Sequence, residues 1–361
     1  MLLHFLSFFA PCAAAQSTDG AVWYNGVWDA LDNETEKLLE EIGVTSGGEN
    51  GFLSLAPGRV AASLFSLFGT SFRELLGRFF TVIAVLLCVA LFTSLAGEGK
   101  TAEAAANVGN LAAAFVIIAV NAELFADCRA SIELTKDLML SLIPVFTGIV
   151  AFSGQPGLAA SFQTVVFAFA ETVSVAFCNI LPAAAAAGTS LGAASAVAPF
   201  AKFNGICKVI SKLVNTAAAF VSGIFVAVLS VRGVIAGAAD TVTIKGLRFL
   251  IGSSVPLVGS AIGDALNSVA AGLGLIKNSV LVLGAAAVAL INLPSLLKLA
   301  AWSFLSYFIS LFAEMLSQPR IAGLLASMKS VVSVLAAVTC FNSFVYIISC
   351  AILITVKGGG G

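Results

Sequence analysis

The chain has 361 residues, of which 59% are hydrophobic and 10% are charged, and its net charge is −1. A soluble protein of this length would carry about 25% charged residues, so this chain lacks the polar residues to cover a surface that faces water. The composition therefore predicts an all-α, polytopic helical membrane protein, consistent with a mean hydropathy of +1.04. The absence of net positive charge and of basic runs argues against a nucleic-acid partner.

Residues 1–15 resemble a secretory signal, because the apolar core "LLHFLSFFA" precedes a small-residue cleavage site after Ala15. Cleavage there would remove His4, the only histidine of the chain. A mature chain without imidazole excludes Ser-His-Asp and Cys-His catalysis and histidine-ligated metals. We therefore expect no enzyme activity, no catalytic residue, no cofactor and no metal. The scattered cysteines are predicted to be small apolar fillers.

Residues 16–58 form a short acidic segment that we expect outside the cytoplasm. Asn33 and Glu36 have the spacing of a capping box, which predicts a helix that starts near Asn33. The segment is too small to bury a core of its own. Two interpretations stay open, namely a solvated linker helix and a docking surface for an extracytoplasmic partner.

Residues 59–78 predict an amphipathic helix that lies in the headgroup region of a membrane, since apolar and polar side chains separate onto two faces. Residues 79–357 form the polytopic membrane domain. A crossing needs about 20 apolar residues. The convincing spans are 79–96, 104–126, 157–181, 213–231, 295–316 and 331–356, and the shorter apolar tracts are 138–153, 249–263 and 279–293. These predict about 7–8 spanning or re-entrant helices.

Proline and glycine interrupt two of the short tracts, "SLIPVFTG" and "SSVPLVGS". Such interruptions are typical of broken or re-entrant helices, so Pro144, Gly148, Pro256 and Gly259 are candidate broken-helix turns. A shift of 112 residues also aligns Pro144 with Pro256 and Pro182 with Pro294. An internal duplication, with units of about 104–182 and 213–294, is one interpretation of this spacing, and chance is the other.

Charged residues inside apolar tracts are functional candidates by default, because each costs a few kcal/mol in a membrane. The candidate pore or intramembrane polar residues are Glu171, Glu123, Arg232, Arg248, Asp264, Lys298 and Glu314. For Glu171 we expect an interior polar contact, either a structural hydrogen bond or a pore group. For Arg232, Lys298 and Glu314 the plainer interpretation is snorkelling at a helix end.

The chain contains no nucleotide-binding loop of the form G-x-x-x-x-G-K-[ST]. The sequence "GEGKT" at 97–101 lacks the leading spacing and a preceding strand, and it predicts a tight turn between two spanning helices. If the protein drives transport, the energy would therefore have to come from an ion gradient or from another subunit.

The second half carries a more specific pattern, which includes Arg248, the turn "VPLVG" at 255–259, Asp264 and Lys277-Asn278. Together with "SQPRIAGLLASMKSV" at 317–331, this pattern resembles the stage III sporulation protein AE family of endospore-forming bacteria. The layout of a signal-like start, an acidic segment and a polytopic body is similar as well.

The resemblance implies a membrane-embedded subunit of the mother-cell-to-forespore channel or secretion-like complex, located in the mother-cell membrane around the forespore. A role as the conduit of that complex is one form of this expectation. The resemblance also implies an ATPase and other membrane and ring-forming subunits as partners, in addition to the lipid bilayer. No catalytic residue carries over from the family. The alternatives are a stand-alone secondary transporter with paired re-entrant hairpins and a membrane scaffold without a permeation path.

Overall fold

A computed structural model describes residues 25–41, 44, 57–96, 100–179, 183, 186, 189–190, 203–254 and 259–355. The described residues form helices and short turns, without a strand. The elements are α3 (Asn33–Glu41), α4 (Pro57–Ala96), α5 (Lys100–Phe152), α6 (Pro156–Ala168), the π-helix η1 (Phe169–Ser174), α8 (Phe203–Ser254), α9 (Gly259–Met315) and α10 (Pro319–Thr355). The predicted signal at 1–15 lies outside the described residues.

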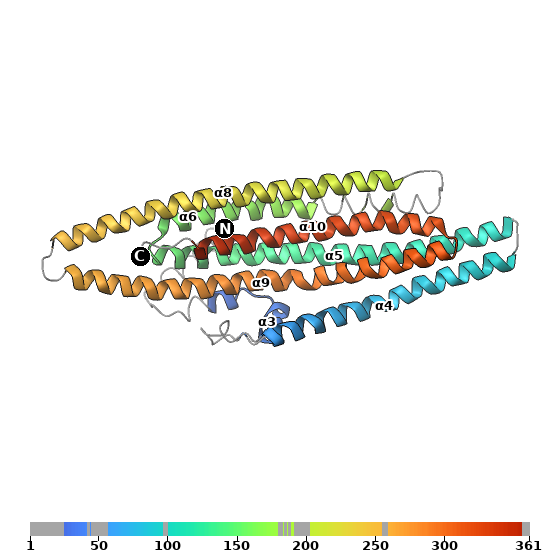
Figure 1. Ribbon diagram of the computed structural model, residues 1–361, viewed down its shortest axis with the longest axis horizontal. Coiled ribbons are helices and arrows are strands. Elements are labelled where there is room, and N and C mark those ends of the chain that lie inside the picture. Colours follow the sequence, from blue (N-terminus) through green and yellow to red (C-terminus); the bar gives the residue numbers. More distant parts are fainter. Residues whose placement is uncertain are drawn as a thin grey trace, which may run out of the picture.

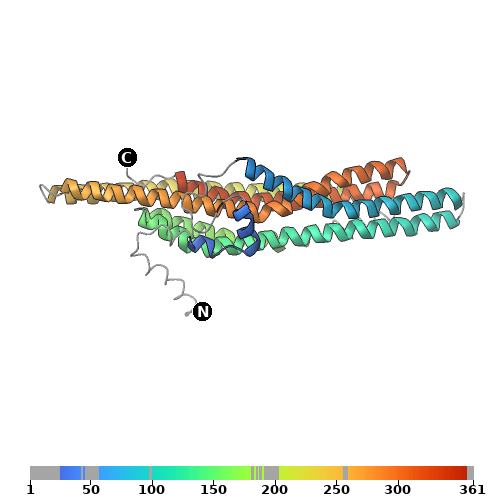
Figure 2. The same ribbon diagram turned by 90° about the horizontal axis from the view of Figure 1, so that it is seen from below.

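The long helices run along one axis and form an elongated bundle (Figures 1 and 2). Helices α5, α8 and α9 contain 53, 52 and 57 residues. At 1.5 Å per residue each is about 80 Å long, whereas the hydrocarbon core of a bilayer is about 30 Å thick. These helices are therefore much longer than a single crossing requires.

Six segments of the described residues are long and apolar enough to cross a membrane, which confirms the all-α polytopic class. The prediction of about 7–8 helices exceeds this number because several predicted elements are parts of one helix. Residues 104–126 and 138–152 belong to α5, and residues 279–293 and 295–315 belong to α9. Whether the first half of α4 lies in a headgroup region stays a prediction.

The broken-helix turn expected at Pro144 and Gly148 is not present, because α5 runs without interruption from Lys100 to Phe152. Proline removes one backbone hydrogen bond of a helix, and packing against neighbouring helices makes this tolerable. Phe146, two residues further on, is fully buried in that packing. The chain instead reverses after Phe152, where Gly154 adopts a φ of 86° and closes the helix end.

The second candidate turn falls partly outside the described residues. Helix α8 ends at Ser254 and Gly259 is the first residue of α9, whereas Pro256 lies outside the described residues. A pair of broken hairpins would need a turn at Pro144, and the continuous helix α5 has none there. The internal duplication stays a prediction.

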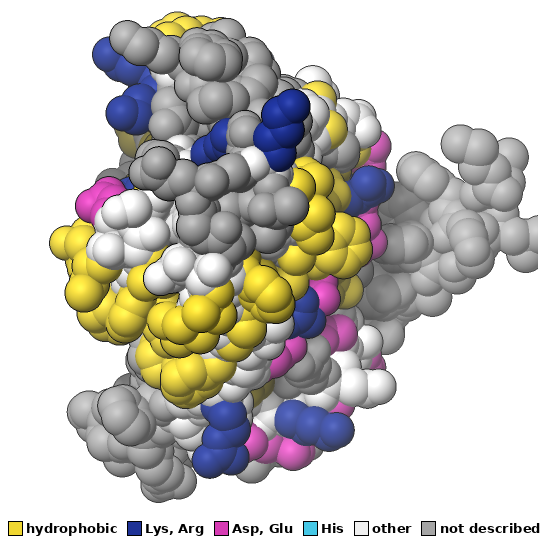
Figure 3. Space-filling model, turned by 90° about the vertical axis from the view of Figure 1, so that its right-hand side faces the viewer, with side chains coloured by type: hydrophobic (Ala, Val, Ile, Leu, Met, Phe, Trp, Pro, Cys, Tyr) yellow, Lys and Arg dark blue, Asp and Glu magenta, His cyan; other side chains and the backbone are white. Residues whose placement is uncertain are grey.

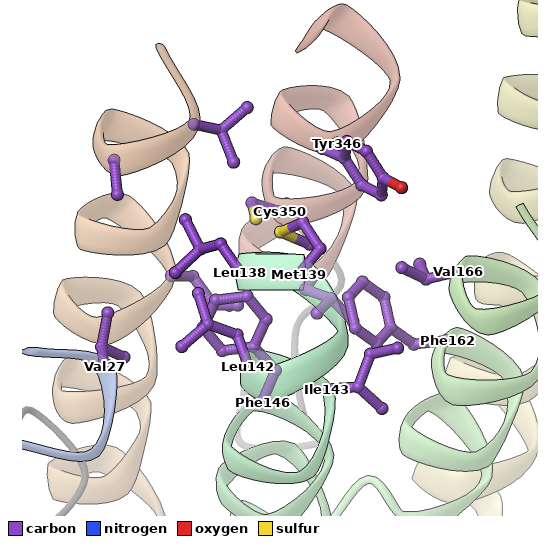
Figure 4. Close-up of a cluster of buried hydrophobic side chains, with 14 of the residues drawn as sticks. Val27, Leu138, Met139, Leu142, Ile143, Phe146, Phe162, Val166, Tyr346 and Cys350 are labelled. Carbon is purple, nitrogen blue, oxygen red and sulfur yellow. The ribbon is translucent and has the colours of Figure 1, made fainter. Parts of the chain in front are cut away.

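Two hydrophobic clusters form the core, one toward each end of the bundle. The first joins α5 beyond Leu138 with α6, α9 and the end of α10. Figure 4 shows Phe146 and Leu142 of α5 between α9 on one side and Phe162 of α6 on the other. The second cluster joins the earlier part of α5 with α4, the later part of α9 and the start of α10. The clusters meet where α5 and α9 carry polar side chains.

The described part of the acidic N-terminal segment, residues 25–41 and Val44, packs on the bundle. Val27, Trp28 and Leu39 are buried in the first hydrophobic cluster, and Figure 4 shows Val27 beside α9. Asp32 caps α3, because the Thr35 amide donates to its Oδ2 at 3.3 Å; the cap thus lies one residue before the Asn33 that we expected. The Trp28 indole donates to Glu36 at 2.9 Å. Docking on its own bundle differs from the interpretation as a solvated linker helix, and a docking surface for an extracytoplasmic partner stays a prediction.

Candidate functional site

Polar side chains follow one face of α5 and one face of α9 where these helices meet. They repeat every three or four residues, so each set lies along one side of its helix. The two sets are Asp127, Ser131 and Thr135 on α5, and Asn292, Ser295 and Lys298 on α9. We call these six residues the polar contact.

Hydrogen bonds connect the two sides of the polar contact directly. The hydroxyls of Ser131 and Ser295 lie 2.6 Å apart, and they lie 3.0 and 3.2 Å from the main-chain oxygen of Asp127. One turn away, the Asn292 amide donates to the Thr135 hydroxyl at 2.7 Å and to the Val288 carbonyl at 2.8 Å. The Asn292 Oδ1 atom is buried without a partner. The helices are thus held in one register by groups that prefer water.

An ammonium group lies at one end of the polar contact. The Lys298 Nζ donates to Asp127 Oδ2 at 3.0 Å and lies 3.6 Å from Glu74 Oε2 on α4. Asp127 and Glu74 are partly exposed, so solvent weakens these ion pairs. The single lysine joins three helices and is shared between two carboxylates.

A cavity of about 170 Å³ adjoins the polar contact. Helix α5 contributes Asp127 and Ser131 to its lining, and α9 contributes Ser295 and Lys298. The N-terminal segment completes the wall with Asp32, Thr35 and Leu38. The docked segment therefore covers a space that polar and apolar side chains line together.

A second buried network surrounds the π-helix η1. The Ser174 hydroxyl lies 2.9 Å from the Asn342 Oδ1 and 2.9 Å from the Tyr346 hydroxyl, both on α10. All three side chains are buried, and the Asn342 Nδ2 has no partner. A π-helical turn adds one residue to a helix and often occurs at functional positions. Here it turns Ser174 toward α10.

Glu171 does not make the interior contact that we expected. It lies in η1 but is exposed on the outside of the bundle. Ser174, three residues later, makes the interior contact instead. The extra residue of the π-turn changes which side chains face inward, and no local pattern in the sequence predicts such a turn. The expectation for Glu171 is therefore wrong.

The other predicted residues are dispersed. Glu123 pairs with Arg78 at 2.7 Å between α5 and α4, and Arg232 is exposed at a groove between α6 and α8. Glu314 is exposed near the end of α9, as expected for a helix end. The side chains of Arg248 and Asp264 lie outside the described residues. Among the predicted charges only Lys298 belongs to the polar contact.

Sequence reasoning missed Asp127, Ser131, Thr135, Asn292 and Ser295. Their signal was available, because small polar residues recur on one face of two otherwise apolar helices. The predicted spans at 104–126 and 138–153 leave the charged stretch 127–137 between them, and the sequence alone does not show which helix packs against it. The described cysteines Cys88, Cys128, Cys178, Cys340 and Cys350 are free thiols.

The fold and its apolar helices define an all-α polytopic protein with a polar contact inside the bundle. The profile of the family "Stage III sporulation protein AE" matches residues 43–357. This chain belongs to that family. It is 26% identical over 338 residues to "Stage III sporulation protein AE" of Bacillus subtilis (strain 168), covering 91% of this chain and 84% of that protein. No solved structure matches the chain.

Proposed function

We propose that this chain is a membrane-embedded, non-enzymatic subunit of the mother-cell-to-forespore channel complex that acts during endospore formation. The observation that carries the proposal is the extent of the family match. Residues 43–357 include every helix from α4 to α10, so membership applies to the whole bundle and supports a role in sporulation. The location in the mother-cell membrane around the forespore is part of this proposal.

The surface of the bundle supports the membrane part of the proposal. Large apolar side chains are exposed along α4 and the start of α5, among them Phe80, Leu91, Phe92, Leu95 and Phe115. Figure 3 shows hydrophobic side chains gathered across the end of the bundle, with basic and acidic ones toward its margins. Apolar area of this extent marks a surface that lipid or protein covers.

Partners supply what the chain lacks. The sequence has no phosphate-binding loop for nucleotide chemistry. We therefore assign the supply of energy to an ATPase subunit of the same complex. We assign the part of the channel outside this bundle to other membrane and ring-forming subunits. A conduit in this bundle would use its interior polar groups. The stand-alone transporter is the weaker candidate, because its paired broken hairpins require a turn where α5 is continuous.

The test uses the native host with the chromosomal copy deleted and a tagged copy restored. The deletion should lower the yield of heat-resistant spores, and the tagged copy should restore it. Affinity purification in mild detergent from sporulating cells should enrich an ATPase and ring-forming proteins. Normal spore yield after deletion would contradict the proposal, and purification without those subunits would favour a stand-alone transporter.

A further inference from the structure

The outer face of α8 is apolar where the helix runs alongside α6 (Figure 1). Phe220, Ile224 and Val231 are exposed on this face. It borders a groove of about 430 Å³ between α8 and the segment formed by α6 and η1. The buried rings of Phe169 and Phe225, with centroids 4.4 Å apart, line that groove. Apolar area of this extent marks a surface that lipid or another protein covers.

The height of this face along the bundle can be read from contacts through α10. Helices α5, α8 and α10 run in the same direction, because their earlier residues share one hydrophobic cluster and their later residues share the other. The Ser211 hydroxyl of α8 donates to the Ser330 carbonyl of α10 at 2.9 Å, and Arg320 of α10 donates to Asn107 of α5. Since all three helices rise equally per residue, each α8 residue lies level with an α5 residue numbered about 94 lower.

The apolar face of α8 is therefore level with the charged part of α5. Residues 213–231 of α8 correspond to roughly 119–137 of α5, a stretch with six charged residues. Arg129 and Asp137 are exposed there. Lipid hydrocarbon at this height would have to surround these charges, which is unfavourable. Another protein surface is thus the better cover for the apolar face of α8.

Two opposite charges beside the groove have no partner within the chain. Glu171 of η1 and Arg232 of α8 are exposed, and among the described residues neither forms an ion pair. Asp240 contacts the start of α6 and Phe225 contacts η1, so the two segments run antiparallel. This register places Glu171 and Arg232 about 9 Å apart along the bundle axis. Their side chains incline toward each other's height, because each points toward the N-terminus of its own helix.

From these observations we propose that the chain forms a two-fold symmetric dimer through the face of α6, η1 and α8, in which Glu171 of each copy pairs with Arg232 of the other. In a two-fold contact the same patch meets itself, so each pair occurs twice. An axis parallel to the bundle gives both copies the same orientation in the membrane. Since one chain carries both charges, the face is complementary to a second copy of itself, and the paired charges fix the register of the contact.

The test measures the dissociation constant of the dimer in liposomes, by energy transfer between donor-labelled and acceptor-labelled copies of the full chain. The native chain should dimerise as the ratio of protein to lipid rises. Glu171→Arg and Arg232→Glu should each raise the dissociation constant by about ten-fold or more, because like charges then meet. The double variant restores both pairs with the charges exchanged, so its dissociation constant should return to within about three-fold of the native value.

An uncharged variant keeps the test decisive if a charge variant fails to fold. Ile224→Ser removes exposed apolar area without changing charge, and it should raise the dissociation constant several-fold. Arg73→Glu is the control, because it reverses an exposed charge on α4, which packs on α5 and α9, and it should leave the constant unchanged. A native chain that stays monomeric at every ratio of protein to lipid would overturn the proposal. So would a double variant that dimerises as weakly as the two single variants.

Discussion

Asn292 illustrates how a single buried amide orients two helices. Its Nδ2 group reaches Thr135 across the interface and Val288 within α9, and the residue is fully buried. Hydrogen bonds between membrane helices contribute about 0.6 kcal/mol on average and up to about 1.7 kcal/mol. When one member of such a pair is removed, the other polar group stays buried without water and without a hydrogen bond, which lowers the stability of the folded state.

We expect Asn292→Leu to lower the free energy of unfolding in detergent by about 1–2 kcal/mol, because the Thr135 hydroxyl loses its donor. Adding Thr135→Val should restore part of the loss, since both partners are then apolar. Denaturant titration of the two single variants and the double variant measures the coupling. Strictly additive effects would show that the two side chains do not interact.

Asp240 stabilises a helix end from another helix. Its carboxylate accepts from the Gly157 amide at 3.0 Å and from the Leu158 amide at 2.9 Å, at the start of α6. Asp240→Ala should lower the free energy of unfolding by about 1–2 kcal/mol, as for other lost N-terminal caps. Thr243→Ala, at an exposed position one turn later, is the control. An equal loss in both variants would assign the effect to α8 itself.

At the scale of the elements, close approach of helices depends on glycine. A Cβ atom on Gly284 of α9 would collide with the ring of Phe146 on α5. The same addition at Gly223 on α8 meets no atom within 4 Å. The two glycines therefore give a matched pair.

Gly284→Ala should destabilise the bundle by about 1–3 kcal/mol, because overpacking outweighs the gain in helix propensity. Gly223→Ala should be neutral or stabilise by up to about 1 kcal/mol. Thermal unfolding of the two variants decides between packing and propensity. Stabilisation by Gly284→Ala would contradict the tight contact between α5 and α9.

Hydropathy predicts the presence of the apolar helices more accurately than it predicts the residues at which they end. Residues 104–126 and 138–153 were separated because six charged residues occupy 123–137. In the structure α5 continues through them: Ser131 and Thr135 face α9, while Arg129 and Asp137 are exposed. A helix that is amphipathic for three turns stays a helix. The partner of the polar face lies far away in sequence, so local patterns could not identify it.

At the scale of the whole molecule, the uncharged helix segments at one end of the bundle are about as long as a bilayer is thick. Residues 79–96 of α4 and 104–122 of α5 contain no charged side chain. Each stretch is close to the roughly 20 residues of one crossing. The charges of α4 and α5, such as Arg78 and Glu123, follow at one boundary.

This arrangement makes a prediction for Phe92, which is exposed on α4. In lipid, Phe92→Arg should cost about 2.5–3.5 kcal/mol if it lies near the membrane centre. We expect a lower yield of the protein in alkali-washed membranes. Ala126→Arg, at an exposed position among the charges of α5, should leave that yield unchanged. Unaltered yield for Phe92→Arg would place this end outside the bilayer.

The distance in sequence between the two sides of the polar contact affects how the chain is made. Asp127 and Lys298 are 171 residues apart. At about 5–20 residues per second, α5 waits roughly 10 to 30 s for α9 to leave the ribosome. During that interval its hydroxyls and carboxylate lack their later partners, and the N-terminal segment lacks part of its docking surface. Insertion is therefore the stage at which a chaperone would have to shelter α5 and a quality-control protease would first recognise a defective chain.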